Sequence, residues 1–321
     1  MRLIHKLKST PSIPHSGADY ERMADRERAL WGVEKGGRRL SWFDSPLLAR
    51  YINRWITGSP KQDWLDYVKI RCAQKPAPRG LNVGCGQGEL ERLIIRRRVA
   101  ECMDGFDISP AAVEIARKKA DEEGFGDRIH YFTADANAIE QSNLPRDYDI
   151  VFASMSLHHF VRLEHCLDHL NRRLAPRGLL IVNEFVGPDR FQWTGDQLNA
   201  VNRLLDCFPR ELKANLRNPG EIKNRVVRPS LKYMKEHMAF EAVCSQRILP
   251  ALRERFHILE QRDYGGTVLQ LLFEAIMGNF DEEECREHAV LVQMAAVAEE
   301  LLLKSGALPH DHTLIIARKK S

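Results

Sequence analysis

The sequence lacks the residue spacings that define metal-binding and disulfide-rich proteins. Its seven cysteines are scattered over 321 residues and include no C-x-x-C pair, so neither a zinc site nor a dithiol redox motif is predicted from them. His165 and His169 lie four residues apart, but the sequence places no third ligand beside them. We therefore expect no metal, and unpaired cysteines are typical of a reducing cytoplasm.

The sequence also has no strong excess of one charge and no long apolar run. It contains 48 Lys and Arg residues against 44 Asp and Glu residues, which leaves a net charge of +4. This is far less basic than a chain dedicated to nucleic acid. No window is long enough to span a bilayer, and the basic first residues never reach the apolar stretch of a signal peptide. The sequence favours a soluble, cytoplasmic protein without membrane contact.

Three glycines are concentrated in one short turn. Gly84, Gly86 and Gly88 stand at alternate positions between a short apolar strand at residues 81–83 and a helical pattern that starts at Glu89. A backbone without side chains can approach a ligand closely there, and the amides of the helix N-terminus would face that ligand. A dinucleotide fingerprint needs its third glycine one residue later. A nicotinamide dehydrogenase is therefore disfavoured, and a test of NADH affinity would discriminate it.

Further strand patterns follow the glycine turn, and two of them lead into acidic residues. Residues 101–107 read as a strand that ends at Asp107, at the position where an open α/β sheet holds ribose hydroxyls. Residues 128–132 read as a third strand and are followed by Asp135. Residues 148–154 read as a fourth strand. Asp107 is therefore a candidate for binding ribose.

This order of pieces resembles the class I S-adenosylmethionine-dependent methyltransferases over roughly Pro78 to Val186. In that family the glycine turn lies under the methionine part of the cofactor, the acid ending the second strand binds ribose, and the acid after the third strand meets the adenine amino group. The chain departs from the family at Asn82, where Asp or Glu is usual, so a charge is missing there. The resemblance implies S-adenosyl-L-methionine as cofactor, S-adenosyl-L-homocysteine as product, and a cofactor site of Gly84, Cys85, Gly86, Gly88, Asp107, Ile108, Asp135, Ala136 and Ser154.

The resemblance also implies the fold class. We expect an α/β protein with a doubly wound, mostly parallel seven-stranded sheet in the order 3-2-1-4-5-7-6, with helices on both faces and an antiparallel last strand near residues 312–318. The expected organisation is an N-terminal helical extension, a Rossmann-like core, a helical lid or insertion after the fifth strand, and a C-terminal completion of the sheet, at residues 1–76, 77–186, 187–254 and 255–321.

The expected insertion carries a basic stretch. Its cations are Arg210, Lys213, Arg217, Lys223, Arg225, Arg228, Lys232 and Lys235, against the acids Glu211, Glu221 and Glu236. Such a stretch is typical of a solvated helical face. The alternative is a lid whose cations attract an acidic acceptor such as a carboxylate or a phosphate.

Two histidines follow the fourth strand. Methyl transfer needs an acceptor atom held in line with the methyl group and shielded from water, and a base helps where the acceptor is a hydroxyl or a protonated amine. We therefore predict His158 and His159 as catalytic residues, together with Glu184 at the end of the fifth strand, which orients the acceptor or pairs with Arg190. In the alternative interpretation, one histidine packs under the cofactor and the other bonds to the backbone.

Three residues are candidates for binding the acceptor. Arg190 and Trp193 stand in the turn after the fifth strand, and Tyr264 stands in the turn after residues 256–260. Loops at the carboxyl ends of strands are where such sheets bind ligands. The alternative for the aromatic residues is that they only pack the lid.

The resemblance implies an enzyme that transfers a methyl group from S-adenosylmethionine to a small-molecule acceptor, sugar-like or acidic, by in-line displacement. One alternative is a nucleic-acid or protein methyltransferase, which the basic insertion favours. Against nucleic acid as a partner, Ser154-Met155-Ser156-Leu157 replaces the Asn/Asp-Pro-Pro-aromatic motif of enzymes that methylate amino groups of bases. The other alternative is a cofactor-binding protein without turnover.

Overall fold

The structure, a computed structural model, describes residues 17–31, 39–72 and 75–320. Its centre is one sheet of seven strands in the order β3-β2-β1-β4-β5-β7-β6, which confirms the expected order. Strands β1 to β5 pair in parallel, whereas β7 pairs antiparallel with both β5 and β6. The strands are β1 (Ala77–Val83), β2 (Ala100–Asp107), β3 (Ile129–Thr133), β4 (Tyr148–Ser154), β5 (Leu174–Phe185), β6 (Phe256–Asp263) and β7 (His312–Lys319).

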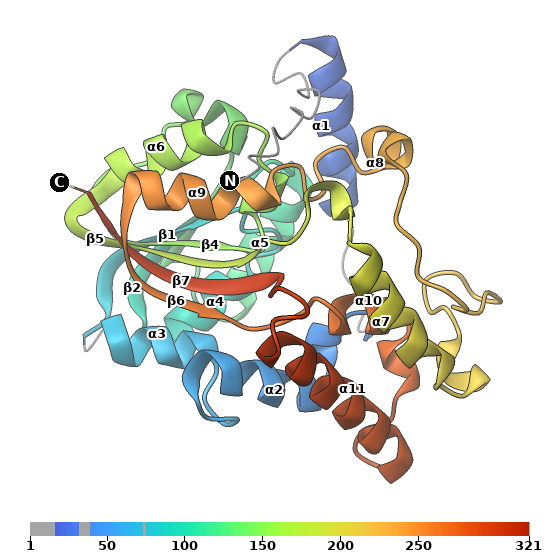
Figure 1. The fold of residues 1–321 in the computed structure, drawn as a ribbon. Helices are drawn as coiled ribbons and strands as arrows, with labels where there is room; N and C mark the ends of the chain where they lie inside the picture. Colours follow the sequence, from blue (N-terminus) through green and yellow to red (C-terminus); the bar gives the residue numbers. More distant parts are fainter. Residues whose placement is uncertain (1–16, 32–38, 73–74, 321) are drawn as a thin grey trace, which may run out of the picture.

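Helices cover both faces of the sheet, because successive residues of a strand point to opposite sides. In β4, Ile150 and Phe152 belong to one buried cluster, whereas Val151 and Ala153 belong to another. Figure 1 shows α6 and α9 above the sheet and α2 and α3 below it. The first cluster also includes residues of α4 and α5. These helices are α2 (Pro46–Thr57), α3 (Trp64–Cys72), α4 (Glu89–Arg96), α5 (Pro110–Glu122), α6 (Leu163–Arg173) and α9 (Ser245–Arg255).

The connection from β2 to α5 is set by its local sequence. Ser109 is the N-cap of α5, where its hydroxyl accepts the amide of Ala112. Pro110 occupies the first helical position, where a missing N–H has no intrahelical partner to lose. The amide of Ser109 also donates to the carboxylate of Asp107. The start of the helix therefore holds Asp107 at the carboxyl edge of the sheet.

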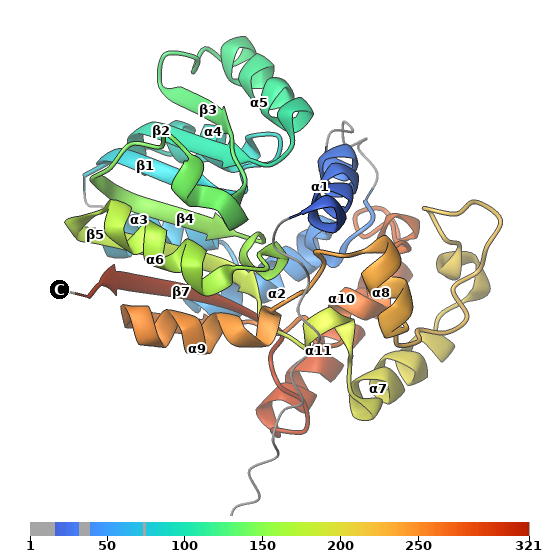
Figure 2. The same ribbon diagram turned by 90° about the horizontal axis from the view of Figure 1, so that it is seen from above.

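Further helices lie beyond the carboxyl ends of the parallel strands. Figure 2 shows α1, α7, α8 and α10 on that side of the sheet. Helix α1 contacts α5, and the guanidinium of Arg26 in α1 donates to the carbonyl of Glu236 in α8. The N-terminal helix and helices from the second half of the chain thus frame the same edge of the sheet. Their bounds are α1 (Ala18–Trp31), α7 (Gly195–Asp206), α8 (Leu231–His237) and α10 (Leu269–Phe273).

Residues 187–254 are divided between two places. Helices α7 and α8 lie beyond the strand ends, whereas α9 packs against α6 on a face of the sheet and buries Ile248 completely.

Part of the basic stretch also holds the fold together. The ammonium of Lys223 donates to the carbonyls of Leu271 and Glu274, and burial lowers its pKa to about 8. Lys223 is therefore a structural cation, not part of a solvated face.

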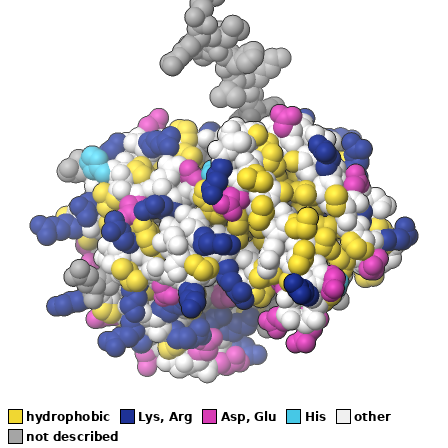
Figure 3. Space-filling model, turned by 60° about the horizontal axis from the view of Figure 1, so that its bottom comes forward, with side chains coloured by type: hydrophobic (Ala, Val, Ile, Leu, Met, Phe, Trp, Pro, Cys, Tyr) yellow, Lys and Arg dark blue, Asp and Glu magenta, His cyan; other side chains and the backbone are white. Residues whose placement is uncertain are grey.

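The outer side of α11 (Arg286–Lys304) is apolar. Its exposed residues Val290, Met294, Val297 and Leu301 recur at helical spacing. Figure 3 shows the face of the molecule that carries α2 and α11, where hydrophobic side chains gather. Neither α11 nor any other helix in the described part of the chain is long and apolar enough to cross a membrane.

Candidate cofactor and acceptor site

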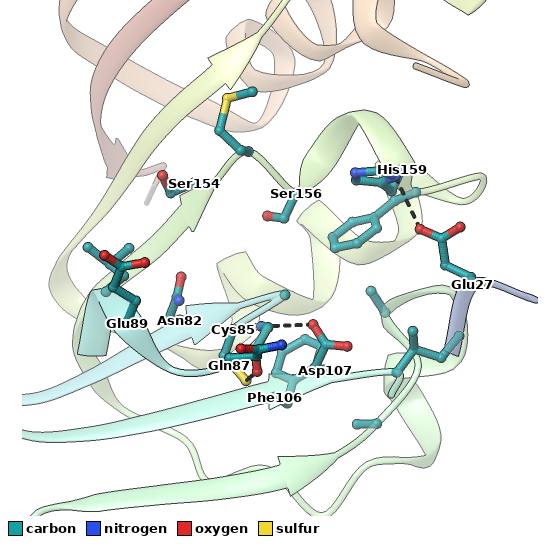
Figure 4. A pocket seen from close by; sticks show the side chains of 18 of the residues that line it. Glu27, Asn82, Cys85, Gln87, Glu89, Phe106, Asp107, Ser154, Ser156 and His159 are labelled. Atoms are coloured by element: carbon teal, nitrogen blue, oxygen red, sulfur yellow. Dashed lines mark hydrogen bonds and ion pairs between the residues drawn. The ribbon is translucent and has the colours of Figure 1, made fainter. Parts of the chain in front are cut away.

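A cavity of about 670 Å³ opens at the carboxyl ends of β1, β2 and β4 (Figure 4). This volume lies within the range of small-molecule and cofactor sites. All but one of the residues expected to bind the cofactor line it, which are Gly84, Cys85, Gly86, Asp107, Ile108, Asp135, Ala136 and Ser154. The glycine turn and the two acids therefore face one space, as a single ligand would require.

The three glycines of the turn have different reasons to lack a side chain. All three have positive φ, at +72° for Gly84, +50° for Gly86 and +74° for Gly88. A Cβ on Gly86 would meet nothing within 4 Å, so its backbone faces open space. A Cβ on Gly88 would lie 2.3 Å from the hydroxyl of Tyr131 and 2.9 Å from Cβ of Ala116. Gly88, which does not line the cavity, is thus required for packing α4 against its neighbours.

Asp107 ties the glycine turn to the end of β2. One carboxylate oxygen accepts the amide of Gly86 at 2.9 Å, and the other accepts the amide of Ser109 at 2.9 Å. Burial raises the pKa of Asp107, and these two amides oppose that rise. Since each carboxylate oxygen can accept more than one hydrogen bond, Asp107 retains acceptor capacity on the side that lines the cavity.

Asp135 is contacted by helix α1. The hydroxyl of Tyr20 donates to one carboxylate oxygen of Asp135, and the amide of Asn137 donates to the other. Burial and the neighbouring carboxylate raise the pKa of Tyr20, so this hydroxyl keeps its proton. Helix α1 therefore reaches the cavity next to the second predicted acid.

A buried acid lies beside Asn82, the position at which the chain departs from the methyltransferase pattern. The amide nitrogen of Asn82 donates to Glu91 of α4 at 2.8 Å. Glu91 is fully buried, and burial raises its pKa to about 7. The amide oxygen of Asn82, in contrast, has no hydrogen-bond partner among the described residues. The site therefore has a carboxyl group behind Asn82, supplied by the helix and not by the strand.

His158 and Glu184 form a buried pair beside the cavity. Nδ1 of His158 contacts one oxygen of Glu184, whose carboxylate also accepts the amides of Ser156, Leu157 and Phe185. A carboxylate that accepts three amides acts as an acceptor toward the imidazole as well. Burial lowers the pKa of His158, but the carboxylates of Glu184 and Glu241 outweigh burial and raise it to about 10.

His159 lines the cavity itself and faces Glu27 of α1, as Figure 4 shows. Nδ1 of His159 lies 3.5 Å from Glu27 and 3.7 Å from Glu241. Nε2 of His158 lies 3.7 Å from the other oxygen of Glu241. Burial and the neighbouring His158 lower the pKa of His159. Two imidazoles and three carboxylates, including Glu184, thus meet at this end of the cavity.

The three residues predicted to bind the acceptor do not line this cavity. The guanidinium of Arg190 is buried and donates to the carbonyls of Met238 and Ala239. Trp193 stacks on Phe191, with ring centroids 5.1 Å apart. The hydroxyl of fully buried Tyr264 donates to Asn183. Glu184 pairs with His158. It does not make the ion pair with Arg190 that the sequence suggested as one possibility.

Comparison with known proteins assigns the class. Residues 81–178 match the model of a family described as methyltransferase domain. The strand order, the glycine turn and this match identify the core as a class I S-adenosylmethionine-dependent methyltransferase domain, with S-adenosyl-L-methionine as its cofactor. The residues present fit this cofactor, because the backbone of Gly86 faces open space and Asp107 and Asp135 line the same cavity.

Curated relatives are methyltransferases of small molecules and carrier-bound groups. The chain is 30% identical to a malonyl-[acyl-carrier protein] O-methyltransferase of Priestia megaterium over 112 residues, which are 35% of this chain and 38% of that protein. It is 28% identical to a demethylmenaquinone methyltransferase of Thermus thermophilus over 148 residues, 46% of this chain and 66% of that protein. The chain thus matches less than two thirds of the length of either relative.

Solved structures support the fold over a longer stretch. The geranyl diphosphate C-methyltransferase of Streptomyces coelicolor A3(2), in complex with Mg²⁺, geranyl-S-thiolodiphosphate and S-adenosyl-L-homocysteine, superimposes with a TM-score of 0.52 at 13% identity. The alignment covers 97% of this chain and all of that one. At such low identity the likeness concerns the fold alone.

Sequence reasoning missed three acids of the site. Glu91 had a signal, because it stands four residues before the buried Ile95 on the inner side of α4. Glu27 and Glu241 had none, because they stand in segments far in sequence from the core and reach the histidines only through tertiary packing.

Proposed function

We propose that this chain transfers the methyl group of S-adenosylmethionine to a small-molecule acceptor by in-line displacement. The observation that carries the proposal is that the glycine turn, Asp107, Asp135 and His159 line one cavity. Had the turn and the acids faced separate cavities, one nucleoside could not contact them all. The methyltransferases of small molecules among the relatives support an acceptor of the same general kind.

The cofactor supplies a methyl group on a sulfonium, which is already electrophilic, so the protein acts mainly by positioning. In the proposed arrangement the backbone of the glycine turn lies against the methionine part, beside Asn82. Asp107 holds the ribose, and Asp135 meets the adenine. Phe160 and Phe240, which also line the cavity, exclude water from the reacting atoms.

The acceptor end is the side with His159 and Glu27. Carboxylates there repel an anionic acceptor that arrives without a counter-cation. Without a bound cation, the site suits a neutral or cationic acceptor. A sugar-like or phenolic hydroxyl would lie next to His159. His159 would hold the polar atom of the acceptor, and His158 and Glu184, buried beside it, would fix the position of His159. Arg190, Trp193 and Tyr264 support the surrounding loops from outside the cavity.

Calorimetry with S-adenosylmethionine tests the cofactor site. Asp107→Ala removes a carboxylate that orders the turn and faces the cavity, and hydrogen bonds to charged groups contribute about 1.5–3 kcal/mol. We therefore expect cofactor affinity to fall about 10- to 100-fold. Asp127→Ala, at an exposed position outside the cavity, is the matched control. Near-normal binding by Asp107→Ala would contradict the assignment of ribose to this residue.

Turnover is tested separately. The wild-type chain is incubated with S-adenosylmethionine and a panel of phenols, quinols, amines and carboxylic acids, and S-adenosylhomocysteine is measured. Cofactor binding without product from any acceptor would favour the alternative of a cofactor-binding protein without turnover.

A further inference from the structure

Metal-ligating side chains converge at the acceptor end of the cavity. His158, His159 and Glu241 each present one donor atom, and these three atoms lie within 4.8 Å of one another. His158 is buried, and Glu241 and His159 are only partly exposed, at 26% and 13% of their side-chain surfaces. The group joins the turn after β4 to the loop after α8, so the fold and not a local motif assembles it.

The separations within this group suit a shared cation better than hydrogen bonds. Nε2 of His158 and Nδ1 of His159 each lie 3.7 Å from an oxygen of Glu241, beyond the usual hydrogen-bond range of about 2.7–3.2 Å. Two ligands bound to one ion at about 2.1 Å lie roughly 3.0–3.4 Å apart at octahedral to tetrahedral angles. These two contacts are to different oxygens of Glu241, and the donors lie within 4.8 Å of one another, so the group would contract to bring all three donors onto one ion.

Glu184 orients His158 as a metal ligand. Since Glu184 accepts three backbone amides, it accepts the Nδ1–H of His158 too, and Nε2 is directed toward Glu241. Metal-binding histidines commonly donate their other ring N–H to a carboxylate in this way, which sets the tautomer and raises ligand basicity. The buried pair of His158 and Glu184 thus has the architecture of a ligand and its supporting partner.

The charges around the group also favour a cation. Glu27, Glu184 and Glu241 surround the two imidazoles. The positive charge of Arg190 also acts on Glu241, but the guanidinium of Arg190 is already bonded to backbone carbonyls. A divalent ion would replace the Nε2 proton of His158 and interact favourably with these three carboxylates.

We propose that His158, His159 and Glu241 bind one divalent transition-metal ion at the acceptor end of the cavity. Two imidazoles and one carboxylate are the ligand set that suits Zn²⁺, Fe²⁺, Co²⁺ or Mn²⁺. Positions left open on the ion are available to an oxygen of the acceptor, because His159 lines the cavity. Such an ion also removes the repulsion of an anionic acceptor. Its use in methyl transfer rests on the proposed function, whereas the metal site does not.

A second group of donors supplies a control. Glu140, His165 and His169 also lie within 4.8 Å of one another, on the outside of the 3-10 helix η2 (Ala136–Gln141) and of α6. Glu140 is exposed there, and Nε2 of His165 already bonds to it at 2.6 Å. A metal that binds adventitiously would choose this exposed group.

The test uses the full chain without an affinity tag, stripped with EDTA and titrated with Co²⁺. We expect one tight Co²⁺ per chain with a visible d–d band. Glu241→Gln and His158→Gln should lose that band, and Glu184→Gln should weaken Co²⁺ binding about 10- to 100-fold. His169→Gln, in the exposed group, should bind Co²⁺ like the wild type. Circular dichroism checks that each variant is folded.

Two results would overturn the proposal. One is the lack of a tight Co²⁺ in the folded wild type. The other is a band that survives in both Glu241→Gln and His158→Gln but disappears in His169→Gln, which would locate the metal in the exposed group. Calorimetry with S-adenosylmethionine in EDTA is run on the same samples. Metal binding without cofactor binding would contradict the proposed function alone, and cofactor binding without metal would contradict this inference alone.

Discussion

Glu91 should make the stability of this protein fall as pH rises from mildly acidic to neutral values. Burial raises the pKa of this carboxyl from 4.5 to about 7, and Glu91 has no exposed surface. The folded state therefore binds the proton more tightly than the unfolded state does. Between these two pKa values the folded chain carries more protons, so the free energy of unfolding decreases as pH increases. The contribution is fully present below about pH 4.5 and is lost as the pH rises to about 7.

The size of this effect follows from the shift. Each pKa unit corresponds to about 1.4 kcal/mol, so the whole shift contributes about 3 kcal/mol. Between pH 5 and pH 8 most of this, roughly 2–3 kcal/mol, should be lost. Because Glu91 is fully buried, this figure needs no reduction for solvent screening. Glu91→Gln keeps the size of the side chain and an oxygen that can accept the amide of Asn82, but it removes the ionisation.

The assay is urea unfolding of wild type and Glu91→Gln at pH 5 and pH 8. Taking the difference between the two proteins cancels the other titrating groups. We expect the variant to gain stability relative to wild type by roughly 2–3 kcal/mol on going from pH 5 to pH 8. Glu89→Gln, an exposed acid in the same first turn of α4, controls for the loss of a charge near the helix N-terminus. Parallel pH profiles for wild type and Glu91→Gln would refute the reasoning.

Two other pairs of substitutions test the turn and the basic stretch. Gly86→Ala should keep the fold but lower the affinity for S-adenosylmethionine in calorimetry, because its Cβ would project into open space at a positive φ. Gly88→Ala should instead lower the free energy of unfolding by about 1–3 kcal/mol, because its Cβ would overlap Tyr131; equal effects of both changes on folding would contradict this division. If the basic stretch is a lid that attracts an acidic acceptor, reversing Arg225 and Arg228 to Glu should weaken acceptor use selectively. Unchanged kinetics would assign these two residues to the protein surface.

Much of the core could be predicted because its signals are local. A strand buried on both faces reads as a continuous apolar run, and the glycine turn needs backbone that only glycine adopts easily. Asp107 and Asp135 follow strands directly, and parallel strands bring their carboxyl ends to one edge. These features carry the resemblance that implies the sheet order and the cofactor; the structure confirms the sheet order, and the family match supports the cofactor.

The acceptor end could not be predicted because its parts are distant in sequence. His158 and His159 were visible after β4, but Glu27 and Glu241 reach them from α1 and from the loop after α8. Arg190, Trp193 and Tyr264 stood in plausible loops, yet none of them lines the cavity. The position of a loop along the chain does not determine which way its side chains point.

The sequence by itself determined the doubly wound sheet, the glycine turn and the class of cofactor, because each depends on short-range patterns of apolar residues, glycines and strand-end acids. Only the tertiary structure decided that Glu91 supplies a carboxyl behind Asn82, and that two histidines meet the carboxylates of Glu27 and Glu241, which are distant from them in sequence. The physical reason is that charge and coordination depend on distances of a few ångströms between side chains, which packing sets and sequence spacing does not.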